Sequence, residues 1–464
     1  MKLSSETKLR LSCIRSVCKN ENGAVLVIGL MFLAILAMLG TTAVVLTTTD
    51  MQIGANYKAH AQAFYDADAG VNYVIAKMEA GLKASPATFT LPTVIGDPTD
   101  PSDPDSVSLA AFTTPSGFGF SFKDPGLTMI AANLFTFTSE GSASNNAQSV
   151  IRVTIERGSA ITLAAFGDEK MEMHNSAQVY SYDSSTSAPA TGIGDSSHQG
   201  DIGSNEWVVT KNSSVIDGDG VFGEYADGSA TTDDIWSVGD FTGDAPSNAG
   251  RIDPDPLGIN SGGEYDPTTY ATAPPNNDND KAVDSLGNDL TSNVILLKSG
   301  GGSPSSIILY GKPGGANYYV TDIDLKNGYS VTIDTRPTGP YGGGPVNLFL
   351  DSPSTAAFDM HNGSAFNVLP ATGDVPPANT NADEFAFFTN YTGKLDVKHS
   401  AAFNGLFYAP LAEVVIHNCG DINGAVWGRQ VDIKNSGVIN YNTALADKYL
   451  SNELTKTTWR DNRS

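Results

Sequence analysis

The longest uniform pattern in the chain is an apolar run without a charged side chain, which covers positions 24–49. No proline follows until Pro86, and apolar residues recur at helical spacing: Tyr57, Ala61, Phe64, Val71, Val74, Ile75, Met78 and Leu82. The pattern predicts one helix from Ala24 to about residue 80, roughly 85 Å long. Its first half is long enough to span a bilayer.

Three strand-like segments follow this helix, at residues 117–122, 134–138 and 149–155. In the last segment, apolar Ile151, Val153 and Ile155 alternate with polar residues, which is typical of a half-buried strand. We therefore predict a small sheet packed on the helix, an α+β unit that covers residues 84–158 and ends near Ser159.

Beyond Ser159 a short pattern occurs seven times: an alternating strand, then His or Lys, then a turn of Asn or His and a small residue. The central turn residues are Asn175, Asn212, Asn327, Asn362, His399, Asn418 and Asn435, which lie 37, 115, 35, 37, 19 and 17 positions apart. Except for 115, these separations are near multiples of about 18, which predicts an all-β parallel β-helix with about 18 residues per coil over residues 159–445. We expect residues 223–303 to be inserted loops, and 446–464 to be a C-terminal cap and tail that begins with an amphipathic helix at Ala444.

The net charge of the chain limits the kinds of partner that it is expected to bind. The formal net charge is −24, which argues against binding to nucleic acid or to an anionic membrane surface. The first 23 residues are basic, so we expect them to remain cytoplasmic while the rest of the chain is exported. Cys13 and Cys18 lie in this leader, and only Cys419 lies outside it.

A basic leader that ends in Gly23, followed by an apolar helix from Ala24, is similar to a type IV prepilin. Residues Ala63, Phe64, Ala67, Asp68, Ala69 and Gly70 resemble the signature of the PilX N-terminal family of minor pilins, with aspartate where glutamate is usual. The resemblance implies a leader (residues 1–23) cleaved between Gly23 and Ala24, a transmembrane and amphipathic pilin helix (24–83) and a small pilin-like sheet domain. The end of the repeat array also resembles β-helical domains that accompany such N-termini.

Major pilins usually carry glutamate at the fifth position after the cleavage site, where this chain has Ile28. The resemblance therefore implies a minor subunit of a pilus or pseudopilus, with a tip or priming role. The partners that it implies are a prepilin peptidase, other minor and major pilins, and inner-membrane lipid before assembly. A single-pass inner-membrane protein with a cytoplasmic N-terminus would then move to the pilus or cell surface, where a surface glycan or protein is a further candidate partner.

Candidate catalytic and metal-binding residues follow the repeat. His174, His361 and His417 share one turn position with several lysines, and lysine does not replace an imidazole ligand. Calcium ligands could gather at Asp217, Asp219, Glu224 and Asp227, although the spacing fails the EF-hand pattern and a solvated turn is the expected structure. We expect no cofactor and no catalysis. The alternatives are a membrane-tethered polysaccharide hydrolase or lyase, and an uncleaved, self-associating envelope scaffold.

Overall fold

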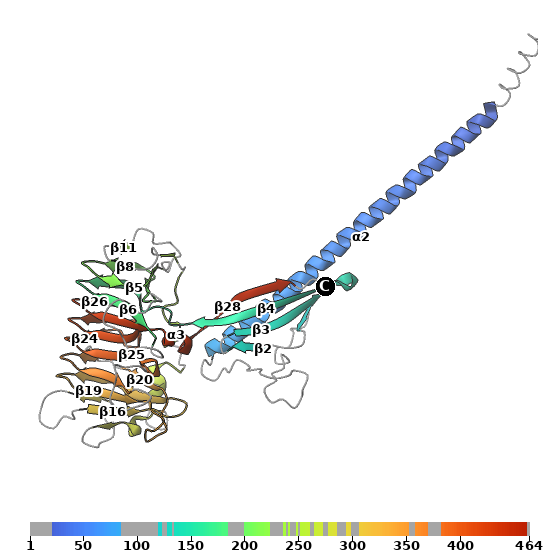
Figure 1. Ribbon diagram of the computed structural model, residues 1–464. Helices are drawn as coiled ribbons and strands as arrows, with labels where there is room; N and C mark the ends of the chain where they lie inside the picture. Colours follow the sequence, from blue (N-terminus) through green and yellow to red (C-terminus); the bar gives the residue numbers. More distant parts are fainter. Residues whose placement is uncertain are drawn as a thin grey trace, which may run out of the picture.

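The computed structural model describes most of the chain outside the leader. The described residues are 21–84, 119–122, 128–131, 134–183, 199–222, 235–237, 240–241, 247–248, 251–259, 264–271, 277–284, 294–297, 306–351, 358–369 and 382–461. Two bodies are visible in Figure 1, a long helix with a small sheet at its C-terminal half and a stack of short strands beyond it.

Helix α2 (Glu21–Ala84) is a single helix of 64 residues, as the apolar pattern predicts. Its segment Val25–Glu79 is long and apolar enough to cross a membrane by length and composition. The half that begins at Val25 stands clear of the rest of the molecule, with side chains from Val25 to Ile53 exposed (Figure 1). The half that follows Ala59 packs on the sheet.

This small sheet has five strands, all paired antiparallel in the order β1-β3-β4-β28, with β2 also on β3. Val71, Val74 and Met78 of α2 pack against the sheet's apolar side chains, which include Phe137 and Leu454. The strands are β1 (Phe120–Phe122), β2 (Thr128–Ala131), β3 (Leu134–Ser142), β4 (Gln148–Ser159) and β28 (Leu450–Asp461).

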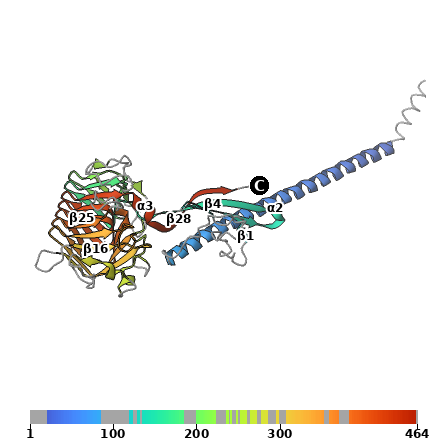
Figure 2. The same cartoon turned by 60° about the horizontal axis from the view of Figure 1, so that its bottom comes forward.

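Strand β28 corrects the predicted C-terminal cap. A short helix, α3 (Ala444–Lys448), is followed at once by β28, which pairs with β4 from Leu450 opposite Ser159 to Asp461 opposite Ile151. Figure 2 shows the two strands side by side between the bodies. The β-helix is therefore inserted between two neighbouring strands of the small sheet, and the chain's last strand completes that sheet.

The second body consists of coils whose strands pair in parallel, as predicted for a β-helix. Each coil crosses three faces. Face 1 contains β5 (Ala165–His174), β8 (Trp207–Thr210), β11 (Ile235–Ser237), β15 (Val294–Leu297), β18 (Asp322–Leu325), β21 (Phe358–Met360), β24 (Lys394–Lys398) and the second halves of β25 (Ala402–His417) and β26 (Asp421–Lys434).

Face 2 contains β6 (Gln178–Tyr182), β9 (Val215–Ile216), β12 (Asp240–Phe241), β16 (Ser306–Tyr310), β19 (Ser330–Asp334), β22 (Ala365–Val368), β27 (Val438–Asn442) and the first residues of β25 and β26. Face 3 contains β7 (Ile202–Ser204), β10 (Gly220–Phe222), β13 (Ser247–Asn248), β17 (Ala316–Val320), β20 (Val346–Leu350), β23 (Phe385–Thr389) and the parts of β5, β25 and β26 not on face 1 or 2.

The order of coils in space differs from their order in the chain. The first coil, β5–β6, pairs with the last, β26–β27, in the middle of the stack. From there the chain winds to one end through β10–β13, and it resumes at the opposite end with β14 (Val283–Asp284) and β15. In Figure 1 the red strand β26 accordingly lies beside the green strand β5, with β8 beyond it. Because the last coil is internal, a helix after it has no open end to cover.

A segment that runs along face 3 joins the two ends of the stack. It comprises the described residues 251–259, 264–271 and 277–284, which we call the strap. It contacts coils in their order along the stack, at Asn205, Trp427, Tyr408, Phe388, Phe349 and Asn317. The described part of 223–303 thus forms strands and the strap, in contrast to the predicted inserted loops. Its Asp and Asn residues favour turns, but here their side chains bond to neighbouring strands.

Candidate interaction surfaces

The small residues of the PilX-like motif form the helix face that meets the sheet. Ala63, Ala67 and Gly70 are buried and lie at helical spacing. A Cβ atom on Gly141 of β3 would collide with the Ala63 carbonyl oxygen and the Ala67 nitrogen, and one on Gly70 would collide with the Ser139 hydroxyl. These positions therefore require minimal side chains so that α2 and β3 can approach closely.

The other motif residues lie beside this contact. Phe64 is partly buried against the core of the small sheet. Asp68 accepts a hydrogen bond of 3.2 Å from the Asn72 amide, one turn along the helix, and Ala69 is half-buried. The motif residues therefore serve to pack α2 against the small sheet.

The predicted processing site lies at the start of α2. Gly23 and Ala24 are within the helical backbone, whereas residues 1–20 of the leader lie outside the described residues. Ile28, five positions after the predicted cut, is 54% exposed on the free half of the helix.

Face 1 of the β-helix carries two rows of charged side chains. The outward-facing carboxylates of Asp324, Asp359, Asp396, Asp432 and Glu172 form one row, flanked by buried apolar residues as the alternation predicts. The second row alternates lysine and histidine from coil to coil: Lys326, His361, Lys398, His417, Lys434, His174 and Lys211.

Ion pairs join these two rows. Lys326 contacts Asp324 at 2.9 Å, Lys398 contacts Asp359 at 2.9 Å and Lys434 contacts Asp432 at 2.5 Å. Burial lowers the pKa of His417, and the neighbouring lysines add to this, while Asp396 opposes it. Among the described residues, only Glu172–His174–Asp432 and Asp324–Asp359–His361 gather enough donor groups for a metal. Lysines already neutralise both trios, so we assign no metal there.

The turn residues after the second row have the backbone that the sequence predicts. All seven central residues have φ between 51° and 62°, and the residue after each also has positive φ. Asn and Gly tolerate this region, which explains the repeated Asn-small pair. Side-chain amides bond from coil to coil, as in Asn212 to Asn175 at 3.0 Å and Asn175 to Asn435 at 2.9 Å.

Asp217 and Asp219, two of the four candidate calcium residues, join no group of metal-binding donors among the described residues, and the burial of Asp217 corrects the expected solvated turn. Asp217 is fully buried, and the backbone N–H of Asp219 donates to the Asp201 carboxylate at 2.7 Å. Burial raises the pKa of Asp201. Glu224 and Asp227, the other two candidates, lie outside the described residues.

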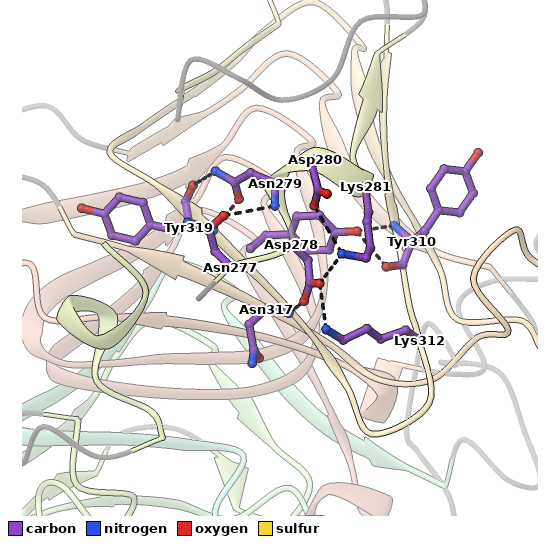
Figure 3. Close-up of polar contacts among 10 residues, drawn as sticks. Asn277, Asp278, Asn279, Asp280, Lys281, Tyr310, Lys312, Asn317 and Tyr319 are labelled. Carbon is purple, nitrogen blue, oxygen red and sulfur yellow. Dashed lines mark hydrogen bonds and ion pairs between the residues drawn. The ribbon is translucent and has the colours of Figure 1, made fainter. Parts of the chain in front are cut away.

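The end of the strap is fixed by a polar cluster that the sequence analysis missed (Figure 3). Asp278 accepts hydrogen bonds of 2.7 Å from both Lys281 and Lys312, and one of 2.9 Å from the Asn317 backbone. Burial alone would raise the pKa of Asp278, but these bonds outweigh it and lower the pKa. The Asn279 side chain bonds to both backbone groups of Tyr319, as a neighbouring strand would. The strap thereby covers strand edges at this end of the stack, that of β17 through Asn279 and that of β16 through its own strand β14.

Comparisons with known proteins agree with this division. Residues 22–72 match the PilX N-terminal family, and residues 321–448 match a domain of unknown function, DUF7305. No curated protein matches the chain. The competence-associated pilin ComZ from Thermus thermophilus is similar over 87% of this chain and 97% of its own, at 13% identity; its TM-score of 0.28 is too low to support an argument. The family match lies on α2, so the N-terminal helix of this chain is similar to the PilX N-terminal family of type IV pilin-like proteins.

Proposed function

We propose that the protein is a minor subunit of a type IV pilus or related pseudopilus, in a tip or priming position, and that it displays its β-helix for assembly priming or adhesion. The observation that carries the proposal is the place of the β-helix. It lies beyond the C-terminal end of α2, on the side opposite the exposed apolar half (Figure 1). A body of this size would obstruct a further subunit stacked above it, but a filament tip leaves room for it.

Ile28 supports the same position. A glutamate at this site would offer a partner to the free N-terminal amine of a neighbouring subunit, and an unpaired charge in an apolar bundle is costly. With Ile28 exposed on the free half of α2, this subunit lacks that partner. We infer that it is disfavoured at ordinary positions in the shaft.

We also propose that the protein is not an enzyme. The carboxylates of face 1 recur with the coil, and lysines of the same face form ion pairs with Asp324, Asp359 and Asp432. A glycosidase instead needs a pair of carboxyl groups in different protonation states. Membrane insertion, processing by a prepilin peptidase and contacts with other pilins complete the proposal.

The first test is the mature N-terminus, measured by mass spectrometry in cells with and without prepilin peptidase. We expect a peptide that begins at Ala24 only when the peptidase is present. Retention of residues 1–23 in both strains would overturn the pilin assignment.

The second test concerns position in the filament. We expect Ile28→Glu to raise the number of copies per purified filament, because the new carboxylate can pair with a neighbouring amine. Ile28→Gln is the matched control, since it is of similar size and polar but uncharged. Equal copy numbers for both variants and the wild type would argue against a position set by Ile28.

A further inference from the structure

One row of outward-facing residues on face 1 differs from the charged rows beside it. Trp207, Lys170, Gln430, Glu413 and Lys394 are register partners on five successive coils, and we call them the track. With coils about 4.8 Å apart, the track is about 19 Å long and runs along the axis of the stack.

Trp207 begins the track with an exposed ring. It is 44% exposed, and Tyr341, at 40%, is the only other large apolar side chain exposed in the described part of the β-helix. Tryptophan at a surface leaves apolar area in contact with water, and it is enriched where a flat partner stacks on it. The outward rings of face 3 are, in contrast, buried beneath the strap.

Three of the four polar members of the track are held in place by neighbours. Lys394 contacts Asp396 at 2.9 Å, and Lys170 forms an ion pair with Glu172. The Gln430 amide donates to Glu169 at 2.6 Å. These contacts orient the hydrogen-bonding groups before a ligand arrives, which reduces the entropy lost on binding.

Charge decides which extended ligand fits. Both track lysines already have carboxylate partners, and Glu413 adds a negative charge in a chain whose net charge is −24. A polyanion would therefore be repelled rather than attracted. An uncharged polymer has no such penalty, and its hydroxyl groups can bond to amide, carboxylate and ammonium groups alike.

We propose that the track binds an extended, uncharged, β-linked polysaccharide, with Trp207 stacked on the apolar face of one sugar ring. A pyranose unit of such a chain is about as long as one coil is tall, so successive sugars meet successive track residues. The inference rests on the adhesive role proposed above and names its ligand class. Trp207 and the other track residues lie on the β-helix, outside the pilin-like helix and the small sheet.

The experiment uses the full-length protein in detergent and titrates it with two uncharged series, cello-oligosaccharides and N-acetylated chito-oligosaccharides of two to six units. Oligogalacturonides of the same lengths are the polyanionic comparison. We expect affinity to rise with length up to about five units, one per track coil. Binding should shift the fluorescence of Trp207, and Trp207→Ala should weaken it by at least about tenfold. Trp207→Phe should retain part of the affinity because it keeps an aromatic face.

Tyr341→Ala is the matched control, because it removes the other exposed ring and should leave binding unchanged. Thermal unfolding of each variant checks the fold. The proposal is overturned if neither series binds, if Trp207→Ala and Tyr341→Ala behave alike, or if only oligogalacturonides bind. Recovery of the wild-type protein in the pilus fraction separates the two proposals. Protein that binds glycans but is absent from pili would refute only the pilus assignment, and protein that is present in pili but binds neither series would refute only the glycan proposal.

Discussion

The indole nitrogen of Trp427 donates a hydrogen bond of 2.8 Å to the carbonyl oxygen of Pro254, 173 positions earlier in the chain. This bond ties the strap to one of the internal coils. The Trp427 ring also stacks on Phe166 of the first coil, with centroids 4.3 Å apart. Trp427 of β26 thus contacts both the strap and the first coil of the β-helix.

We expect Trp427→Phe to lower the free energy of unfolding by about 1–2 kcal/mol, because the Pro254 carbonyl loses its donor. Trp427→Ala should cost about 3–5 kcal/mol, since it also leaves a cavity. Denaturant unfolding of the full-length protein in detergent measures both. Trp207→Phe is the control at an exposed site and should change stability by less than about 0.5 kcal/mol; an equal loss for the two phenylalanine variants would contradict the anchoring role.

The contact between α2 and β3 should not tolerate a methyl group. We expect Gly141→Ala to destabilise the small sheet by about 2–3 kcal/mol, because the new Cβ collides with helix backbone at Ala63 and Ala67. The measurement is hydrogen exchange of the β3 amides. Gly158→Ala is matched to it in chemistry, has no atom within 4 Å of the new Cβ, and should exchange like the wild type.

The last strand should stabilise the small sheet more than the β-helix. Leu454 is 9% exposed in the core between α2 and the sheet, so Leu454→Ala should cost about 2–4 kcal/mol there. Faster hydrogen exchange in β4, with unchanged exchange in β23 to β26, is the expected pattern. Lys456→Ala is the control: it removes an exposed side chain of the same strand whose ammonium donates to Asn72 of α2 at 2.7 Å, and should cost less than about 1 kcal/mol. Uniform loss of protection in both bodies would mean that they unfold as one unit.

Stability should fall as pH rises through weak acidity. Burial raises the pKa of Asp421 from 3.8 to about 6. Below the unfolded value the group is protonated in both states, so it costs nothing. Between about pH 4 and 6 the unfolded chain ionises first, and above pH 6 the folded protein bears a buried charge. Asp421→Asn should therefore raise stability at pH 7.5 by about 1–3 kcal/mol and leave it unchanged at pH 4.

Asp278→Asn supplies the opposite sign as a control. Bonds from Lys281, Lys312 and the Asn317 backbone lower the pKa of Asp278, so its stabilisation is present above the unfolded pKa and lost as pH falls through the folded pKa. This variant should melt lower than the wild type at pH 7.5, with the difference shrinking in acid. Thermal unfolding from pH 3 to 8 compares the two variants; a pH-independent gain for Asp421→Asn would refute the burial argument.

Local patterns determined much of this protein. Helical spacing and the absence of proline predicted α2, alternation predicted β3 and β4, and the Asn-small pairs predicted turns with positive φ, because each depends on neighbours in the chain. The period of about 18 residues likewise predicted parallel coils. The motif around Ala63 and Gly70 showed the resemblance to the PilX N-terminal family, which residues 22–72 match, although its packing role depends on the small sheet.

Only the tertiary structure decided how these parts join. Strand β28 lies next to β4, about 290 positions earlier in the chain, because the two strands satisfy each other's backbone hydrogen bonds. The residues around Leu450 do not by themselves show whether this strand pairs with β4 or faces solvent. The order of the coils has the same origin: β5 can pair equally well with any strand of matching alternation, so register alone does not say that its neighbour is β26. The sequence of the strap is typical of a loop, because its Asp and Asn residues form turns in isolation. The bonds of Asp278 and Asn279 to β17, and the stacking of Tyr270 on Phe349, exist only once the coils are stacked.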